Sequence, residues 1–110
     1  MRIHINNEVA IMQPYIFPYL GYFNLINSSK YFVFLDDVNY INKGWVNRNF
    51  ILLNGSAYKF CIPLKKSSQN TKINDLIINN DSYAKKKILN TLYHAYHKAR
   101  YFNQVFKLIE

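Results

Sequence analysis

Hydrophobic positions in the first 35 residues form two continuous runs separated by a segment with helical spacing. Val9 to Met12 is a short apolar run before a proline, which predicts a buried strand. The spacing that follows predicts a helix from about Tyr19 to Ser28. Tyr31 to Leu35 predicts a second strand, covered on both faces. Strand, helix, strand is the smallest crossover unit of a parallel sheet, and it places the loop after the first strand beside the residues after the second. The inward face of the helix is expected to carry Tyr19, Tyr22, Phe23 and Ile26.

The middle of the chain predicts an antiparallel hairpin. Asn54-Gly55 separates two strand-like runs, Trp45 to Leu53 and Ala57 to Pro63, and both turn residues accept the positive φ that a tight hairpin needs. After a polar, basic loop, Ile73 to Ile78 predicts one more short strand.

Two helices are predicted at the carboxyl end. Asp81 or Ser82 can cap a helix that runs from Asp81 to Arg100, and an amphipathic pattern from Phe102 predicts another helix. The pattern therefore predicts a single α/β domain over residues 1–110. We expect a mainly parallel sheet with helices, Rossmann-like and nucleotidylyltransferase-like, plus the antiparallel hairpin.

Composition adds a preference for anionic partners. The 110 residues carry a formal net charge of +8, which favours nucleic acid, phosphorylated metabolites or anionic lipid head groups without choosing among them. Cys61 is the single cysteine, so no internal disulfide is expected. Apolar runs stay well short of the ~18 residues of a membrane-spanning helix, and polar residues interrupt any signal peptide. We expect a cytoplasmic protein without a transmembrane segment.

The first candidate for chemistry is the segment IMQPYIFPYLGYF, residues 11–23. Its prolines fix the shape of a loop, Gly21 allows a ligand or backbone to approach closely, and the free amides of the following helix could bind a phosphate or carboxylate. The alternative is that the tyrosines fill the helix–sheet interface and Gly21 relieves a close contact.

Asp36 and Asp37 follow the second predicted strand, at the edge where open α/β sheets bind ligands. Paired carboxylates there can bind a metal, accept a proton or hold ribose hydroxyls. A solvated turn in which Asp37 caps the next segment is the alternative. No second cluster of carboxylates is near in sequence, so no metal site is predicted.

The segment KGWVNRN supplies the second candidate, with Lys43, Trp45 and Arg48 suited to gripping a phosphate or carboxylate. Arg48 is predicted to be half-buried and therefore to need a partner. That partner is an anionic ligand or a salt bridge to Asp36 or Asp37, and the two can coexist. Lys65 and Lys66 open a basic, hydroxyl-rich loop that could cradle a phosphate, although many surface loops look the same.

Three long motifs together resemble the opening two-thirds of WbqC-like proteins: IMQPYIFPYLGYFNLIN, FVFLDDVNYINKGWVNRNFILLNG and PLKKSSQNTKI. The resemblance implies a role in making O-antigen or related surface polysaccharide, for which transfer of glycine or a similar acyl group onto a sugar has been proposed. It also implies that the chain is the amino-terminal part of a longer protein. The matching motif positions are Gln13, Pro14, Tyr15, Pro18, Gly21, Asp36, Asp37, Lys43, Gly44, Trp45, Arg48, Lys65 and Lys66.

A looser likeness connects the first strand and PYLGY to nucleotidylyltransferases, in which an HxGH signature follows the first strand. Tyr19 and Tyr22 stand where the histidines would be, and phenols with pKa values near ~10 are poor proton donors at neutral pH. The fold can therefore be shared while the chemistry differs.

The function we expect is a transferase that uses an anionic nucleotide sugar or activated donor. Arg48, Lys65 and Lys66 hold the donor, and Asp36 or Asp37 acts as base or hydroxyl anchor. No cofactor or oligomeric state is assigned. One alternative is a nucleotidylyltransferase-type enzyme, if Gln13, Tyr22 and Arg48 converge on a phosphate-sized pocket. A basic nucleic-acid-binding module is the less favoured second alternative, and an inactive fragment with an apolar patch on its last two helices is the third.

Overall fold

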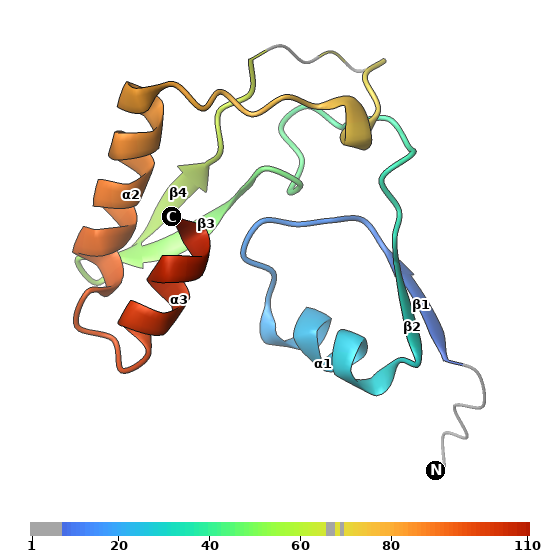
Figure 1. The fold of residues 1–110 in the computed structure, drawn as a ribbon, viewed down its shortest axis with the longest axis horizontal. Coiled ribbons are helices and arrows are strands. Elements are labelled where there is room, and N and C mark those ends of the chain that lie inside the picture. The colour runs from blue at the N-terminus through green and yellow to red at the C-terminus, as the bar shows by residue number, and fades with distance from the viewer. Residues whose placement is uncertain (1–7, 66–67, 69) are drawn as a thin grey trace.

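A computed structural model of the protein describes residues 8–65, 68 and 70–110 (Figure 1). Two lobes can be distinguished, which we call the first lobe (β1, α1 and β2) and the second lobe (β3, β4, α2 and α3). A long connection with a short 3₁₀ helix leaves β4, reaches the loop after β2 and returns to α2 (Figure 1). In chain order the elements are β1 (Val9–Met12), α1 (Leu20–Ser28), β2 (Tyr31–Phe34), β3 (Arg48–Leu53), β4 (Ser56–Cys61), the 3₁₀ helix (Ile73–Asp75), α2 (Ser82–Tyr96) and α3 (Phe102–Ile109).

The first lobe is the predicted parallel crossover unit. Strands β1 and β2 run parallel in register from Val9 opposite Tyr31 to Met12 opposite Phe34. The face that carries Phe32 meets α1, where the ring of Tyr22 lies 5.5 Å from that of Phe32. Side chains alternate between the two faces of a strand, so Val9 and Tyr31 belong to the opposite face, where both are exposed. The expectation that β2 is covered on both faces is therefore wrong for the described residues.

Helix α1 also packs less than its sequence pattern predicts. It begins at Leu20, after Tyr19, which is 72% exposed, and Phe23 and Ile26 are exposed as well. Among the described residues of this helix, Tyr22 is the one that is buried. The reason is size, because two strands of four residues form a surface only about 13 Å long and two strands wide.

The second lobe confirms the predicted hairpin. Strands β3 and β4 pair antiparallel from Arg48 opposite Cys61 to Leu53 opposite Ser56. Asn54 and Gly55 form the turn with φ values of 51° and 79°, as a two-residue hairpin turn requires. A hydrophobic cluster forms where the hairpin meets α2, with Ile51, Phe60 and Leu92 buried together.

The two predicted carboxyl-terminal helices are both present, with one changed boundary. Asp81 caps α2 by accepting a hydrogen bond from the backbone N–H of Ala84 at 2.8 Å. The helix ends at Tyr96 and does not continue to Arg100, because the chain turns there and the N–H of Ala99 bonds to the carbonyl of Tyr96 at 2.8 Å. Helix α3 then runs from Phe102 to Ile109, as the amphipathic pattern predicts.

The prediction of a strand from Ile73 to Ile78 is wrong. Ile73 is buried, and its backbone N–H donates a hydrogen bond to the carbonyl of Val38. The N–H of Asn74 donates to the carbonyl of Asp36. These bonds tie the segment to the loop after β2 as a 3₁₀ turn, which asparagine and aspartate favour over a strand. The fold is thus mixed α/β, but its described strands form two separate two-stranded sheets and not one mainly parallel sheet.

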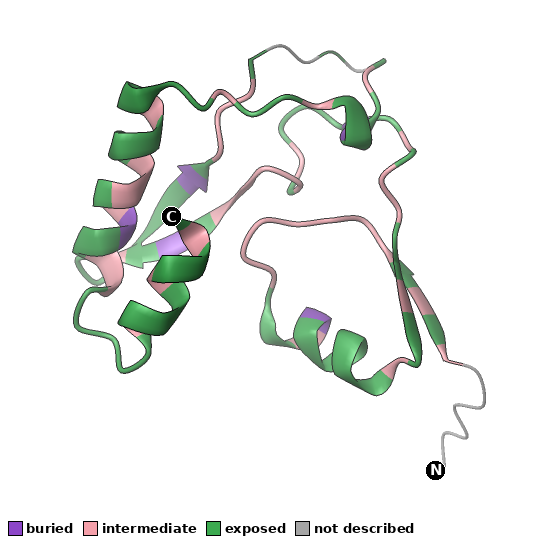
Figure 2. Cartoon of the chain, viewed as in Figure 1, coloured by how far each residue is buried: buried purple, intermediate pink, exposed green. Residues whose placement is uncertain are grey.

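Little of the chain is buried. Figure 2 shows small buried regions scattered through both lobes, with most of each helix exposed. The Cα radius of gyration is 16.2 Å, whereas a compact domain of this length has about 13 Å. The buried hydrophobic residues among those described are Tyr22, Tyr40, Ile51, Phe60, Ile73 and Leu92. Both lobes therefore leave much apolar surface open to solvent.

Candidate anion-binding site

Arg48 is the best-positioned charged side chain of the predicted site. Its Nε donates a hydrogen bond to the carbonyl of Gly44 at 2.7 Å, and Nη2 donates to the carbonyl of Lys43. The guanidinium carbon lies 5.3 Å from the centre of the Trp45 ring, within the range of a cation–π contact. These contacts fix the orientation of the guanidinium and use two of the five N–H donors that such a group has.

The backbone before Arg48 curls to make this arrangement. Lys43 has a φ of 61°, in the left-handed region, and the N–H of Gly44 bonds to the carbonyl of Ile41 at 3.0 Å. A Cβ at position 44 would lie 3.0 Å from that carbonyl oxygen, a tight contact that Gly44 avoids. The turn thereby directs two carbonyl groups at the guanidinium of Arg48.

Tyr40 and Asn47 form a hydrogen-bonded clamp next to Arg48. The buried Tyr40 donates its hydroxyl proton to Oδ1 of Asn47 at 2.9 Å, and Nδ2 of Asn47 donates to the carbonyl of Ile62 at 2.9 Å. The backbone carbonyl of Asn47 also accepts from the N–H of Ile62 at 2.7 Å. The clamp joins the start of β3 to the end of β4.

A cavity of about 240 Å³ lies between this clamp and the turn before Arg48. Of the described residues that line it, Lys43 and Arg48 are the cationic ones, and amide, hydroxyl and thiol groups come from other lining residues. The described residues that line it are Tyr40, Asn42, Lys43, Asn47, Arg48, Cys61, Ile62, Pro63 and Leu64. Two cations beside neutral hydrogen-bonding groups suit an anion such as a phosphate or carboxylate.

Tyr40, Asn47 and Cys61 are members of this cavity that the sequence motifs did not single out. A signal for Cys61 was present, because a two-residue turn at Asn54-Gly55 places position 61 directly opposite position 48. The Sγ of Cys61 lies 3.6 Å from Nδ2 of Asn47, and the thiol is free and exposed. Tyr40 had no comparable signal, since its contact with Asn47 arises within an irregular loop.

Gln13, Tyr15 and Tyr22 meet in a second cluster, in the first lobe. The hydroxyl of Tyr22 donates to the carbonyl of Gln13 at 2.7 Å, and the rings of Tyr15 and Tyr22 meet edge to face at 5.8 Å. Burial raises the pKa of Tyr22 above its ordinary value of 10.0, and the neighbouring Tyr15 raises it further. This phenol therefore stays protonated and serves a contact inside the fold.

The loop after Gln13 joins the two clusters. The N–H of Ile16 bonds to the carbonyl of Val46 at 2.9 Å. Nδ2 of Asn49 donates to the carbonyls of Ile16 and Phe17 at 3.2 and 2.8 Å. Phe17 has a φ of 47°, a conformation that non-glycine residues rarely adopt, and the contacts from β3 hold it there.

The remaining predicted site residues that the structure describes are not among the lining of the 240 Å³ cavity. Gly21 has the ring of Tyr19 where a Cβ would be, at 2.3 Å, which agrees with the relief of a close contact. The half-buried Asp36 and the exposed Asp37 follow β2 beside the end of β1, where the N–H of Leu35 bonds to Met12. Exposed Lys65 follows the lining residue Leu64, and Lys66 is outside the described residues.

Two further features of the described residues bear on the class of protein. Within residues 8–65, 68 and 70–110, no three side chains of His, Cys, Asp or Glu gather as metal ligands would. In the same residues, no helix has the length and apolar character needed to cross a membrane. The fold and site thus define a small mixed α/β protein with a candidate anion site.

Comparison with known proteins identifies the family. The sequence model of the WbqC-like protein family matches residues 13–110, and the chain belongs to this family. The chain is also 33% identical over 79 residues to the uncharacterized protein Rv1507c of Mycobacterium tuberculosis. The matched stretch is 71% of this chain but 34% of that relative, so the chain spans about a third of the relative's length. No solved structure gives a significant match.

Proposed function

We propose that this WbqC-like protein binds a phosphate-containing or carboxylate-containing donor in the 240 Å³ cavity and acts in a transfer reaction of surface-polysaccharide biosynthesis. The observation that carries the proposal is the fixed guanidinium of Arg48, held by two carbonyl groups and by Trp45, with Lys43 in the same cavity. Held in place before binding, such a guanidinium loses little conformational entropy when it takes up an anion.

The size and chemistry of the cavity support a small anionic group. Drug-sized ligands occupy pockets of roughly 300–1,000 Å³, so about 240 Å³ suits a phosphate or one sugar phosphate more than a whole nucleotide sugar. The nucleoside part of a larger donor would extend beyond the cavity. Lys65, which follows the lining residue Leu64, would meet that part.

The transferase role and its polysaccharide substrate come from the resemblance of the motifs to WbqC-like proteins. In this role Asp36 or Asp37 would act as base or hydroxyl anchor from the carboxyl end of β2, the edge of a parallel sheet at which ligands bind. The parallel β1–α1–β2 unit is the part of the fold that supports a Rossmann-like frame.

The test is the ligand-induced shift in the thermal unfolding midpoint of the 110-residue protein. Inorganic phosphate, UDP-glucose and ATP are each added at millimolar concentration, because a ligand that binds the native state raises the midpoint. We expect a shift with a phosphate-containing ligand that disappears in Arg48→Ala. Arg48→Lys should keep only part of it, since lysine keeps the charge but loses the planar fork and the stacking on Trp45.

Arg100→Ala is the matched control, because it removes an arginine that lies outside the cavity. Each variant is compared with itself with and without ligand, so a loss of intrinsic stability does not enter the result. A shift of the same size in Arg48→Ala and in the wild type would place the anion elsewhere and contradict the proposal. No shift with any of the three ligands would do the same.

A further inference from the structure

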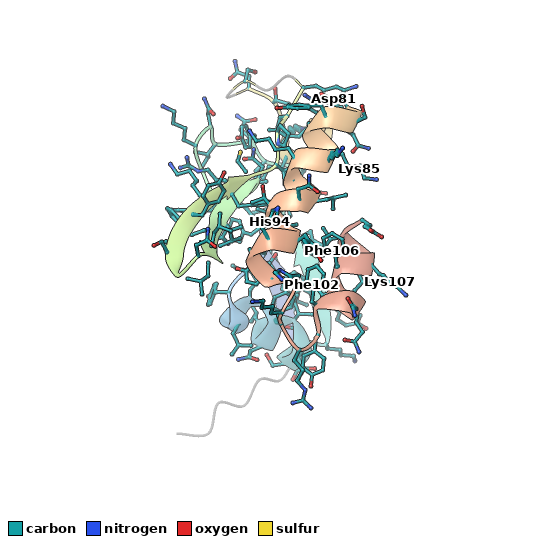
Figure 3. The ribbon with its side chains drawn as sticks, turned by 90° about the vertical axis from the view of Figure 1, so that its left-hand side faces the viewer. Asp81, Lys85, His94, Phe102, Phe106 and Lys107 are labelled. Atoms are coloured by element: carbon teal, nitrogen blue, oxygen red, sulfur yellow. The ribbon has the colours of Figure 1, made fainter. Side chains whose placement is uncertain are left out.

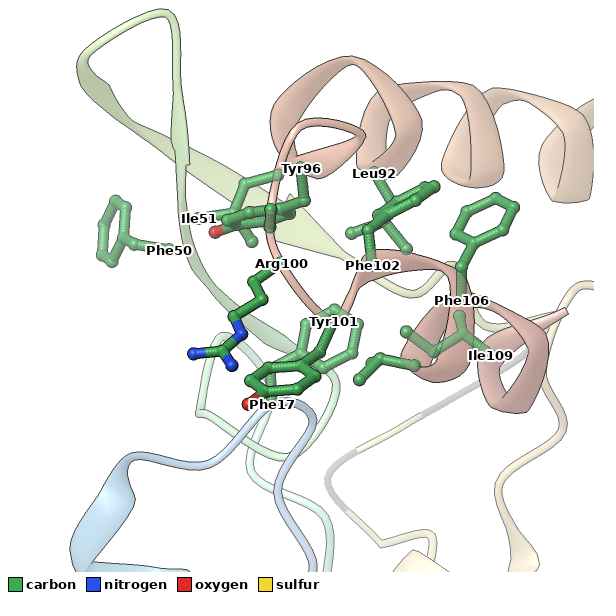
Figure 4. Close-up of a pocket in the computed structure, with 12 residues that line it drawn as sticks. Phe17, Phe50, Ile51, Leu92, Tyr96, Arg100, Tyr101, Phe102, Phe106 and Ile109 are labelled. Carbon is green, nitrogen blue, oxygen red and sulfur yellow. The ribbon is translucent and has the colours of Figure 1, made fainter.

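A second and larger concavity lies where the second lobe meets the loop at Phe17, and we call it the apolar groove (Figure 4). It has a volume of about 460 Å³ and lies between β3, the loop at Phe17, the end of α2 and helix α3. Phe17, Leu92, Phe102 and Phe106 contribute rings and branched carbons to its lining. Val105 on α3 lines it as well and is 50% exposed. Of the described residues that line the groove, Arg100 is the charged one.

The chain exposes more surface than a compact protein of its mass. Its accessible surface is 8826 Å², whereas about 6,400 Å² is typical of a folded monomer of 13.1 kDa. The excess over the whole chain is roughly 2,400 Å², and a standard protein interface removes about 800 Å² from each partner. The open surface is therefore large enough for a stable polypeptide interface.

The geometry of the groove favours side-chain docking over strand addition. Strand β3 pairs with β4 on one edge, and on the other the N–H of Leu52 is already bonded to the hydroxyl of Tyr96 at 3.0 Å. A further strand would have to displace Tyr96 from this edge. An apolar helix face, which needs no backbone hydrogen bonds from its partner, can be packed without that change.

Charge around the groove indicates what flanks the apolar face of the occupant. Arg100 lies in the lining, Lys107 projects away from α3 (Figure 3), and Lys85 of α2 lines a neighbouring pocket together with Phe106 and Glu110. The whole chain has a net charge of +8, which opposes pairing with a second copy of itself. An occupant with acidic residues beside its apolar face complements this surface.

The longer relative shows where such a polypeptide can come from. The matched stretch is 34% of the M. tuberculosis protein, so that member of the family carries about two-thirds of its length outside the region matched here. We infer that the apolar groove is the docking surface for an amphipathic, acidic-flanked helix from this further part of a WbqC-like fold. The inference does not depend on the proposed anion site.

Binding is tested with the part of the M. tuberculosis relative outside its matched region, produced as a separate polypeptide. We expect a complex with the 110-residue protein, seen by titration calorimetry, and loss of the fluorescence of a dye that binds exposed apolar surface. Val105→Asp should weaken the complex at least about tenfold, because it places a charge in a desolvated contact. Leu108→Asp, on the same helix but outside the groove and 88% exposed, should change it less than about twofold.

A fusion protein shows whether a failure to form the complex is caused only by weak affinity between the two separate polypeptides. The same part of the relative is fused to the carboxyl end of the 110-residue protein. Dye binding should fall, the unfolding midpoint should rise, and Val105→Asp should lower that midpoint far more than Leu108→Asp. A fusion that still binds dye and responds equally to both substitutions would overturn the inference.

Two other results would overturn it as well. If sedimentation shows a dimer of the 110-residue protein that Val105→Asp dissociates and Leu108→Asp does not, the occupant is a second copy. If laurate binds with a dependence on Val105 and Arg100 while the relative's polypeptide does not displace it, the occupant is an anionic amphiphile.

Discussion

The two lobes differ in how much of their sheet is buried. In the second lobe, Ile51 and Phe60 of the hairpin pack against Leu92 of α2, and all three are buried. In the first lobe, Tyr22 is the buried residue of α1, and the outer face of the parallel pair is exposed. A hairpin next to a long amphipathic helix can form a small core by itself. A parallel pair has two apolar faces, and one short helix covers only one of them.

The two lobes also differ in the chemistry of their buried side chains. The buried cluster of the second lobe is entirely hydrophobic, so its stability follows from packing and the removal of apolar surface from water. The first lobe depends on a phenol whose hydroxyl must keep its hydrogen bond to the carbonyl of Gln13. Substitutions in the two lobes should therefore differ in size and in their response to pH.

The largest effect is expected for Leu92→Ala. It removes the α2 side chain that packs against Ile51 and Phe60, at a cost of about 2–5 kcal/mol of unfolding free energy. Urea unfolding followed by circular dichroism measures this loss. Leu108→Ala, at an exposed position of α3, should change stability by less than about 0.5 kcal/mol. Equal losses at both positions would show that the cluster is not the core of the second lobe.

Asn49→Asp tests whether the two lobes unfold as one unit. The substitution places a carboxylate against the carbonyls of Ile16 and Phe17 in place of an N–H donor, at a cost of about 1–3 kcal/mol. Fluorescence of Trp45, the single tryptophan, and circular dichroism should report the same transition in the wild type and separate transitions in the variant. Asn90→Asp on the exposed side of α2 is the control and should keep the two signals together.

Tyr22→Phe should cost about 1–2 kcal/mol, because it deletes a buried hydroxyl and leaves the carbonyl of Gln13 without this donor. Tyr19→Phe removes a hydroxyl from an exposed ring and should be nearly neutral. Denaturant unfolding at pH 7 compares the two variants. If they prove equally stable, the hydrogen bond from Tyr22 does not stabilise the first lobe.

The smallest effect concerns pH and applies to the first lobe. Because burial raises the pKa of Tyr22, the unfolded chain ionises this tyrosine near pH 10 while the folded chain still holds the proton. The stabilisation is complete below that pH and is lost as pH rises through the folded-state pKa. The difference in unfolding free energy between the wild type and Tyr22→Phe should therefore narrow between pH 9 and 11. A constant difference across this range would contradict the raised pKa.

Several features could be predicted because they depend on neighbours in the sequence. The turn at Asn54-Gly55 determined the hairpin register, and of the two predicted capping residues, Asp81 and Ser82, Asp81 is the one that caps α2. The motifs also indicated the family to which the chain belongs. By contrast, Ile73 to Asp75 has a strand-like start but forms a 3₁₀ turn, because its amides bond to the distant loop after β2.

The candidate site shows the same division. From its sequence Arg48 was expected to be half-buried and in need of a partner, and the structure gives it two carbonyl groups and the ring of Trp45. The clamp between Tyr40 and Asn47 joins irregular backbone segments, for which periodicity carries no information.

The sequence by itself thus determined the parallel strand–helix–strand unit, the hairpin and its turn, the two carboxyl-terminal helices, the positive charge and the family, since each depends on residue type and local spacing. Only the tertiary structure decided which cations share a cavity, which aromatic rings are buried and which faces stay uncovered. These outcomes depend on contacts between residues far apart in the chain, such as Asn49 with Ile16 and Phe17. Local spacing does not specify such contacts, because packing chooses among many arrangements with the same local pattern.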